Sequence, residues 1–429
     1  MRFFLVLLAC AAVFSAHAQS SPPLTLAHAL AAAEEAHPDL RLAEAERAAS
    51  VAERELAASR DDWNVNFEAG LRRARPSTGG NDLSDNSARL AARKNLYDFG
   101  RTALSEQAAA DTVAARDLNL LETRDRRRIE IMARFFDTLT ADMQYTAASE
   151  YMAVAYVTFD NGRDRFRVGQ ISAADLAELE HRYQELRVKR NEAQARLRAT
   201  RALLASAMNR PGQLAGELED PPLPGNNRRL PEFETLLPLL QEHSPHLRAQ
   251  RSLLAAAARR LEALRAEDSP SLDAELEAAN YTRETPTRDN LKAGVVLTWP
   301  LYQGRRISAQ VAREQAQFHR LQAEAEKLAM DLTQALLETW LEIGELQHTV
   351  REAAKKQTAY RDLALEQARG LYELELRAHL GDAMAATMEA KLRERRTEYR
   401  LALALARLEA LLGRPLPEAE NQGSEGESK

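Results

Sequence analysis

The sequence predicts a mainly α-helical fold with a small β part, and it predicts that this plan occurs twice. Long segments carry apolar residues at steps of three and four, which is typical of helices, and short segments alternate apolar and polar residues, which is typical of strands. Three motifs also recur in the same order, about 204 to 207 positions apart: HPDLR and SPHLR at 37 and 244, LYDFGR and LYQGR at 96 and 301, and NRP and GRP at 209 and 413. Such recurrence indicates an internal repeat.

The first eighteen residues are expected to be a secretory signal peptide. Arg2 precedes an apolar run from Phe3 to Phe14, and Ala16-His17-Ala18 has the small-residue pattern of a cleavage site. The single cysteine, Cys10, lies inside this segment, and both its removal with the signal and its lipidation stay open. We expect an exported protein with no spanning helix after the signal.

The charge pattern argues against nucleic acid as a partner. The chain has 58 Lys and Arg residues against 64 Asp and Glu residues, and the two signs are interspersed. Nucleic-acid binding requires a clustered basic surface, which this pattern does not predict.

We expect two repeats of one plan: an Ala-rich helix, two strands, a long helix, a turn and a returning helix. Repeat 1 spans residues 19–210 and repeat 2 spans residues 231–416. The Pro-, Gly- and Asn-rich residues 211–230 are expected to form a linker, and residues 417–429, with few apolar side chains, a disordered tail. The opening helices are expected over 25–60 and 232–267, and the long helices over 102–164 and 306–374.

The strand pairs differ in the strength of their signal. Val65, Phe67 and Ala69 alternate with polar residues, and so do residues 272–278 and 291–299, whereas residues 87–96 would also suit a helix. Two strands per repeat cannot seal a sheet, and four per chain are fewer than the smallest outer-membrane barrels contain. We therefore expect several identical chains to pool their strands in one closed barrel.

Four landmarks in this order resemble the outer membrane efflux protein family, the TolC-like channels. They are LTLAHAL with HPDL at 24–40, LYDFGR at 96–101, RFRVGQISAADL at 165–176, and WPLYQGR at 299–305. The second and fourth are similar to the family's P-L-F-D-G-G-R signature, and the third is similar to its R-Y-x-x-G-x-I-S-x-x-D-L helix-tip motif. The resemblance covers almost the whole chain after the signal.

The resemblance implies a homotrimer in the outer membrane that extends into the periplasm. Four strands per chain would build a transmembrane β-barrel, and the helical hairpins would build a periplasmic α-barrel. The implied function is a passive exit duct in a tripartite efflux or type I secretion system, with a periplasmic adaptor (a membrane fusion protein) and an inner-membrane pump as partners. Neither a cofactor nor catalysis is expected.

The first helix tip is the strongest candidate site. The resemblance implies that the adaptor docks there, at Val168, Gly169, Gln170, Ile171 and Ser172. The residues alone predict a turn in which Gly169 adopts a left-handed conformation and Ser172 caps the returning helix with Asp175. A well-capped turn without docking is the alternative.

Charged residues cluster at the second tip and are a candidate aperture gate, because carboxylate rings in a trimer would favour cations. They are Arg369, Glu373, Glu375, Arg377 and Asp382. A solvated charged helix end is the alternative. This tip departs from the family pattern, since Leu376 stands where repeat 1 has Gly169.

Gly100 and Gly304 are expected to permit the bend from strand to long helix. Tyr97, Trp299 and Tyr302 are either an aromatic girdle at the membrane boundary or ordinary packing residues. His243 and His246 lack a third ligand nearby in the sequence, so no metal site is expected.

The rival function is a periplasmic coiled-coil adaptor or scaffold, against which the strand pairs between the helices argue.

Overall fold

The computed structural model describes residues 23–75, 83–213, 216–283, 288–374 and 380–416. The predicted signal peptide at 1–18 and the predicted tail at 417–429 lie outside these ranges. The described chain forms two compact units, and each of them combines residues from both halves of the sequence. The repeat and linker boundaries therefore remain a prediction.

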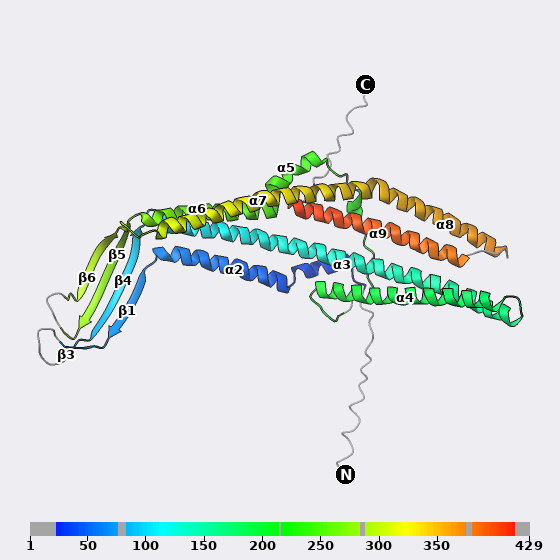
Figure 1. Ribbon diagram of the computed structural model, residues 1–429, viewed down its shortest axis with the longest axis horizontal. Coiled ribbons are helices and arrows are strands. Elements are labelled where there is room, and N and C mark those ends of the chain that lie inside the picture. Colours follow the sequence, from blue (N-terminus) through cyan, green and yellow to red (C-terminus); the bar gives the residue numbers. More distant parts are fainter. Residues whose placement is uncertain (1–22, 76–82, 214–215, 284–287, 375–379, 417–429) are drawn as a thin grey trace, which may run out of the picture. The chain divides into compact units, whose positions relative to one another are not determined.

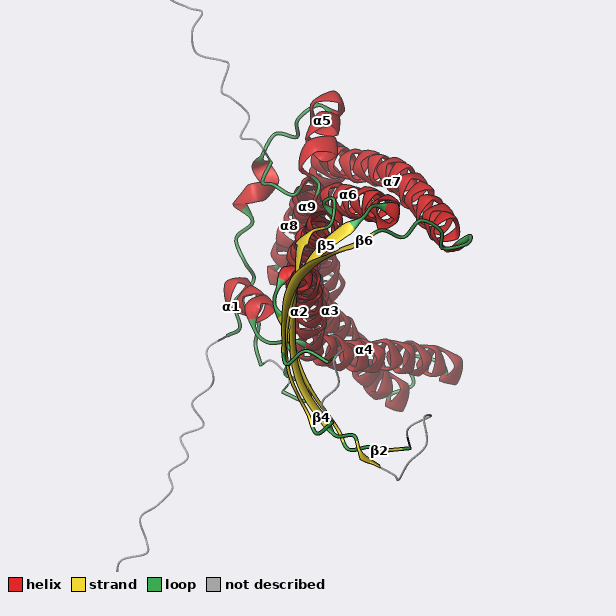
Figure 2. Ribbon diagram, turned by 90° about the vertical axis from the view of Figure 1, so that its left-hand side faces the viewer, coloured by secondary structure: helices red, strands yellow, loops and turns green. Residues whose placement is uncertain are grey.

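One unit contains a four-stranded antiparallel sheet in the order β1-β4-β5-β6. Its strands are β1 (Asn64–Gly70), β4 (Ser87–Tyr97), β5 (Ser271–Tyr281) and β6 (Leu291–Thr298), and they form one curved ribbon (Figures 1 and 2). A separate short pair joins β2 (Arg73–Ala74) to β3 (Leu83–Ser84). Residues 87–96, whose sequence also suited a helix, are thus a strand that pairs on both sides.

The central pairing joins the two halves of the sequence. β4 pairs with β5 over nearly its full length, from Ser87 opposite Tyr281 to Tyr97 opposite Leu272, with an irregularity between Asn95 and Tyr97. Within the described residues, β1 and β6 each have a single partner strand in this sheet, so both of its outer edges are open.

The same unit has a helical core in which the apolar faces of four helices meet. They are α5 (Phe233–His243), α6 (Pro245–Arg265), α7 (Arg306–Glu345) and the end of α9 (Leu380–Leu412). Leu236, Leu336 and Leu408 are fully buried there. Trp340 packs at the margin, where its indole N–H donates to the Pro231 carbonyl at 2.9 Å.

Each opening helix is broken into two, where the sequence predicted one. Residues 32–37 separate α1 (Leu26–Ala31) from α2 (Pro38–Ala58), and Ser244 separates α5 from α6. In both cases the second helix begins at a proline. Proline disfavours helical geometry in the residue before it, and His37 and Ser244 accordingly have ψ of 151° and 123°. Proline is then well placed at the first position of the next helix, where its missing N–H is not needed.

The long helix predicted over 306–374 is also interrupted. α7 ends at Glu345, a π-helical turn spans Leu346–Val350, and α8 runs over Arg351–Glu373. At this turn the Gln347 side-chain amide donates to the backbone carbonyls of Asn226 and Arg228, at 3.3 and 2.9 Å. These contacts come from a segment distant in the sequence, so the helical periodicity did not reveal the turn.

The other unit is built of α1, the later part of α3 (Arg101–Arg167), α4 (Ala173–Ala207) and segments of α8 and α9. α3 and α4 form a hairpin in which the Tyr183 ring stacks against Phe159, with centroids 5.9 Å apart. Leu24 forms an isolated parallel bridge with Leu218. Among the helices in the described ranges, none has both the length and the apolar content needed to cross a membrane.

Candidate functional site

The four-stranded sheet has one polar and one apolar face. Residues directly opposite each other in an antiparallel sheet share a face. The register therefore places Glu68, Arg89 and Arg93 on the same face as the carboxylates of β5. Lys292 joins them from β6 because it lies opposite Glu277.

Ion pairs connect the charges of the polar face. Arg93 Nη2 lies 2.7 Å from Asp273 Oδ2, and Arg93 Nε lies 3.7 Å from Glu275 Oε1. Arg89 Nε lies 3.5 Å from Glu277 Oε1. Asp273 is buried and also accepts a hydrogen bond of 3.0 Å from the Asn95 side chain. The buried carboxylate is thus satisfied by two side chains of β4.

The opposite face of the sheet is apolar and largely exposed. Phe67 is 71% exposed and Leu291 is 76% exposed, which is far more than a soluble sheet normally allows for large apolar side chains. The other large apolar residues with exposed side chains on this face are Val65, Leu90, Leu276, Val295 and Leu297. Lys94 is the single charged residue on this face within the four strands.

The predicted bend residues lie at the strand-to-helix junctions and have the expected geometry. Gly100 and Gly304 have φ of +80° and +66°, a region that favours glycine. Phe99, beside Gly100, also has a positive φ of 58°. Asp98 holds this bend, because its Oδ2 accepts hydrogen bonds from the Thr102 amide at 2.8 Å and the Thr102 hydroxyl at 2.6 Å.

The aromatic residues near these junctions are exposed. Tyr97, Trp299 and Tyr302 each have more than half of their surface open, and the ring of Tyr97 makes an edge contact with Phe99 at 4.9 Å. Open aromatic rings are compatible with a girdle, which stays a prediction.

The first tip has the turn that its residues predicted. The Gln170 amide donates to the Arg165 carbonyl and the Gly169 amide to the Phe166 carbonyl, which is the Schellman pattern of a helix end. Gly169 has φ of +73°. Ser172 and Asp175 then form a capping box at the start of α4. Val168 is 69% exposed, and whether this tip docks a partner remains a prediction.

Only part of the candidate gate can be placed. Glu375 and Arg377 lie outside the described residues. Glu373 ends α8 and is exposed, and Arg369 pairs with Glu366 on its own helix at 2.8 Å. Asp382, in the first turn of α9, lines a cavity of about 180 Å³ with Tyr151 and Arg182. A gate at this tip stays a prediction.

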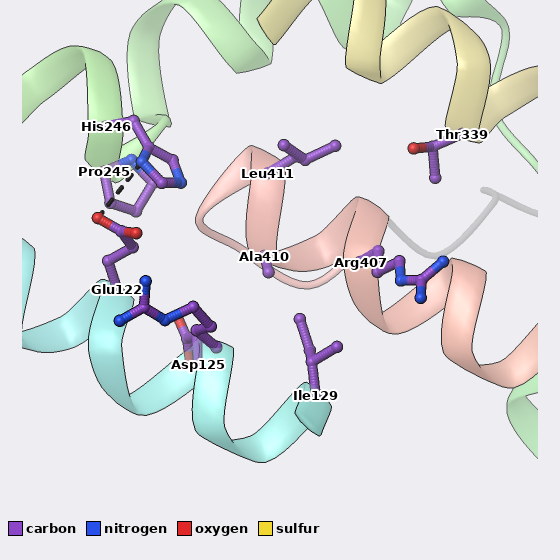
Figure 3. A pocket seen from close by; sticks show the side chains of 10 residues that line it. Glu122, Asp125, Ile129, Pro245, His246, Thr339, Arg407, Ala410 and Leu411 are labelled. Carbon is purple, nitrogen blue, oxygen red and sulfur yellow. Dashed lines mark ion pairs between the residues drawn. The ribbon is translucent and has the colours of Figure 1, made fainter. Parts of the chain in front are cut away.

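A larger cavity of about 320 Å³ lies in the unit that contains the sheet, among α3, α6, α7 and α9 (Figure 3). His246 Nδ1 lies 3.4 Å from Glu122 Oε2 on its wall. Burial raises the pKa of Asp125, an effect that Arg128 opposes and Glu34 adds to. Ile129 and Leu411 make much of the remaining lining apolar.

The two histidines considered for metal binding have separate partners. His246 faces Glu122, whereas His243 lies 3.8 Å from its neighbour Glu242. No group of three or more His, Cys, Asp or Glu side chains could hold a metal ion within the ranges that the structure describes.

The sequence interpretation missed the arginines of the sheet. Residues 87–96 suited both a helix and a strand, so Arg89 and Arg93 were not placed on a face. Their spacing of four positions fits one strand face as well as one helix face. Only their pairing with β5 showed that they meet carboxylates.

The comparisons with known proteins identify the fold. No family model and no curated protein matches the chain. Among solved structures, it is similar to the CmeC outer membrane channel of Campylobacter jejuni, with a TM-score of 0.75, 13% identity and coverage of 92% of this chain and 87% of that chain. It is also similar to the outer membrane protein VceC of Vibrio cholerae, with a TM-score of 0.73, 16% identity and coverage of 91% and 96%.

A third solved structure is the MtrE outer membrane channel of Neisseria gonorrhoeae, with a TM-score of 0.73, 19% identity and coverage of 91% of this chain and 89% of that chain. These similarities extend over nearly the whole length of each chain. The chain therefore has the fold of the TolC-like outer membrane channels, as the resemblance of its motifs predicted.

Proposed function

We propose that this protein is the outer membrane channel of a tripartite efflux or type I secretion system, and that it acts as a passive exit duct. The observation that carries the proposal is the sheet, which within the described part of the chain has two open edges, an exposed apolar face and a charged face. An apolar face of this kind is stable against lipid, but open strand edges are not.

Closure by identical copies removes both open edges. The sheet has four antiparallel strands, so β6 of one copy would run antiparallel to β1 of the next and continue the same pairing. A ring of three copies would place the apolar face toward lipid and the polar face toward water. The fold of the solved channels supports this arrangement.

The helical part supports a duct that meets partners in the periplasm. The tip at Val168–Ser172 offers an ordered, exposed turn for an adaptor, and an inner-membrane pump would supply the energy. The charged residues at the second tip would act as the aperture gate, with acidic rings that favour cations. The localisation that follows is the outer membrane, with an extension into the periplasm.

Cysteine crosslinking between copies tests the closure. Phe67→Cys on β1 would be combined in turn with Leu291→Cys, Ala293→Cys and Val295→Cys on β6, all on the apolar face. We expect oxidation of at least one pair in outer membranes to give covalent dimers and trimers on denaturing gels.

The matched control places the two cysteines on opposite faces, as Phe67→Cys with Lys292→Cys, and should give no crosslink. Purified chain reconstituted in planar bilayers should conduct ions. A protein that stays monomeric and gives no conductance would refute the proposed function.

A further inference from the structure

Charge on the polar face of the sheet is almost balanced, and the balance is organised in rows across the strands. Glu68 lies opposite Arg89, Arg93 lies opposite Glu275, and Glu277 lies opposite Lys292. Each of these three rows holds one carboxylate and one cation. The fourth row has Asn95 opposite Asp273, so it alone carries a net negative charge.

Arg93 connects the row that it shares with Glu275 to the row of Asn95 and Asp273. Its guanidinium contacts Asp273 at 2.7 Å and Glu275 at 3.7 Å, so one cation faces two carboxylates. The Arg93 side chain is 56% exposed while that of Asp273 is 7% exposed. The cation therefore lies between the buried carboxylate and the solvent on this face.

We propose that this ladder of paired charges keeps the ion selectivity of the channel wall low, with Arg93 as the cation that faces two of its four carboxylates. The inference rests on the proposed function, because it requires the polar face to line a water-filled passage. The wall of each copy then has one net negative charge, and it adds a weak preference for cations over anions to that of the acidic rings proposed at the second tip.

A nearly neutral wall has a chemical consequence for cargo. A wide pore with a strong field of one sign would exclude solutes of the same sign, whereas paired charges keep the potential low. The ladder thus suits a duct that passes cationic, anionic and neutral solutes. The choice of cargo is then made elsewhere in the proposed efflux or secretion system, and not by the sheet wall.

Single-channel recordings of the full chain under a KCl gradient test the inference. The more dilute side is kept near 10 mM, where the Debye length is about 30 Å and wall charge acts across the pore. Arg93→Gln doubles the net negative charge of each wall, and we expect the potassium-to-chloride permeability ratio to rise about twofold. Glu275→Gln makes the wall neutral, and we expect the potassium-to-chloride permeability ratio to fall below that of the unaltered chain.

Two further variants separate charge from structure. Arg93→Gln combined with Glu275→Gln restores the original net charge, so the ratio should return to that of the unaltered chain. Lys94→Gln removes the same charge from the adjacent residue on the opposite face, and we expect no change in the ratio. A purely structural role of Arg93 would not be rescued by the double variant.

The outcomes are distinct. Absence of conductance in the unaltered chain would refute the proposed function and this inference with it. The inference would be overturned if Arg93→Gln and Glu275→Gln had the same potassium-to-chloride permeability ratio. It would also be overturned if Lys94→Gln shifted that ratio as much as Arg93→Gln does. Either result would leave the channel function standing. If Arg93→Gln does not assemble, the permeability ratio of Glu275→Gln tests the inference: a fall supports it, and an unchanged ratio overturns it.

Discussion

Gly169 shows how one residue determines the geometry of the first tip. Its φ of +73° costs an L-amino acid about 1–2 kcal/mol, and no side-chain atom lies near the position of an added Cβ. Gly169→Ala should therefore act through backbone strain alone. We expect amides of the tip to lose protection by about 1 kcal/mol in hydrogen exchange.

The matched control for this variant is Gly344→Ala. Gly344 lies inside α7, has helical geometry and also has open space around it. Alanine there should stabilise the helix by about 0.5–1 kcal/mol. Equal effects of the two substitutions would contradict the assignment of strain to Gly169.

The capping box at the same tip predicts a dependence on pH. Hydrogen bonds from the Ser172 amide and hydroxyl lower the pKa of Asp175 below its ordinary value of 3.8. A pKa that is lower in the folded state means that the stabilisation is complete above pH 3.8 and is lost as pH falls through the folded pKa. We expect the protection of tip amides, corrected for intrinsic exchange rates, to fall in this acidic range.

Asp175→Asn provides the comparison for the pH experiment. Its side chain does not ionise, so protection at the tip should be lower at neutral pH and should change little below pH 3.8. If amide protection at the tip fell with pH in the same way in the unaltered chain and in Asp175→Asn, the carboxylate would not be what holds the turn.

The repeated motifs explain how the elements are bounded. Pro38 and Pro245 start helices, Gly100 and Gly304 precede long helices, and both NRP and GRP follow a helix end. At the last pair, Asn209 and Gly413 have φ of 58° and 68°, and the next amide donates five residues back. The sequence therefore repeats its helix boundaries more closely than its helix interiors.

Asp98 is the residue on which the start of α3 depends most directly. Its carboxylate holds the Thr102 amide and hydroxyl at a junction where two successive residues have positive φ. We expect Asp98→Ala to destabilise the protein by about 1–2 kcal/mol, the usual cost of a lost cap. Denaturant unfolding followed by circular dichroism would measure it.

A suitable control for Asp98→Ala is Asp137→Ala within the same helix. Asp137 is exposed and pairs with Arg134 at 3.8 Å, so its removal should change stability by less than about 0.5 kcal/mol. If Asp137→Ala lowered the free energy of unfolding as much as Asp98→Ala does, a capping role of Asp98 would be contradicted.

On the scale of the whole molecule, stability in the unit that contains the sheet depends on the leucine core. Leu336 is fully buried among residues of α5, α6 and α9. Leu336→Ala should destabilise this unit by about 2–5 kcal/mol through lost burial and the cavity left behind. The control is Leu341→Ala, on the same helix but 53% exposed. It should lower the free energy of unfolding by well under half as much as Leu336→Ala does. Denaturant unfolding followed by circular dichroism would measure both.

Sequence reasoning recovered most of the elements but not their interruptions. The strands with clear alternation, the long helix of repeat 1 and the tip at 168–172 were predictable because their signals are local. The breaks before Pro38 and Pro245 were missed because apolar residues continue on both sides of them, although the prolines were a usable signal. The π-helical turn was not predictable, because its contacts come from Asn226 and Arg228.

By itself, the sequence determined the bounds of the long helix of repeat 1, the turn chemistry of the first tip and the two-faced character of the clearly alternating strands, all of which depend on neighbouring residues along the chain. The tertiary structure decided that β4 and β5 pair across the two halves, and hence that Arg93 faces Asp273 and Glu275. The physical reason is that strand pairing is a contact between segments about 180 positions apart, and no local periodicity specifies which strand or register a segment will choose.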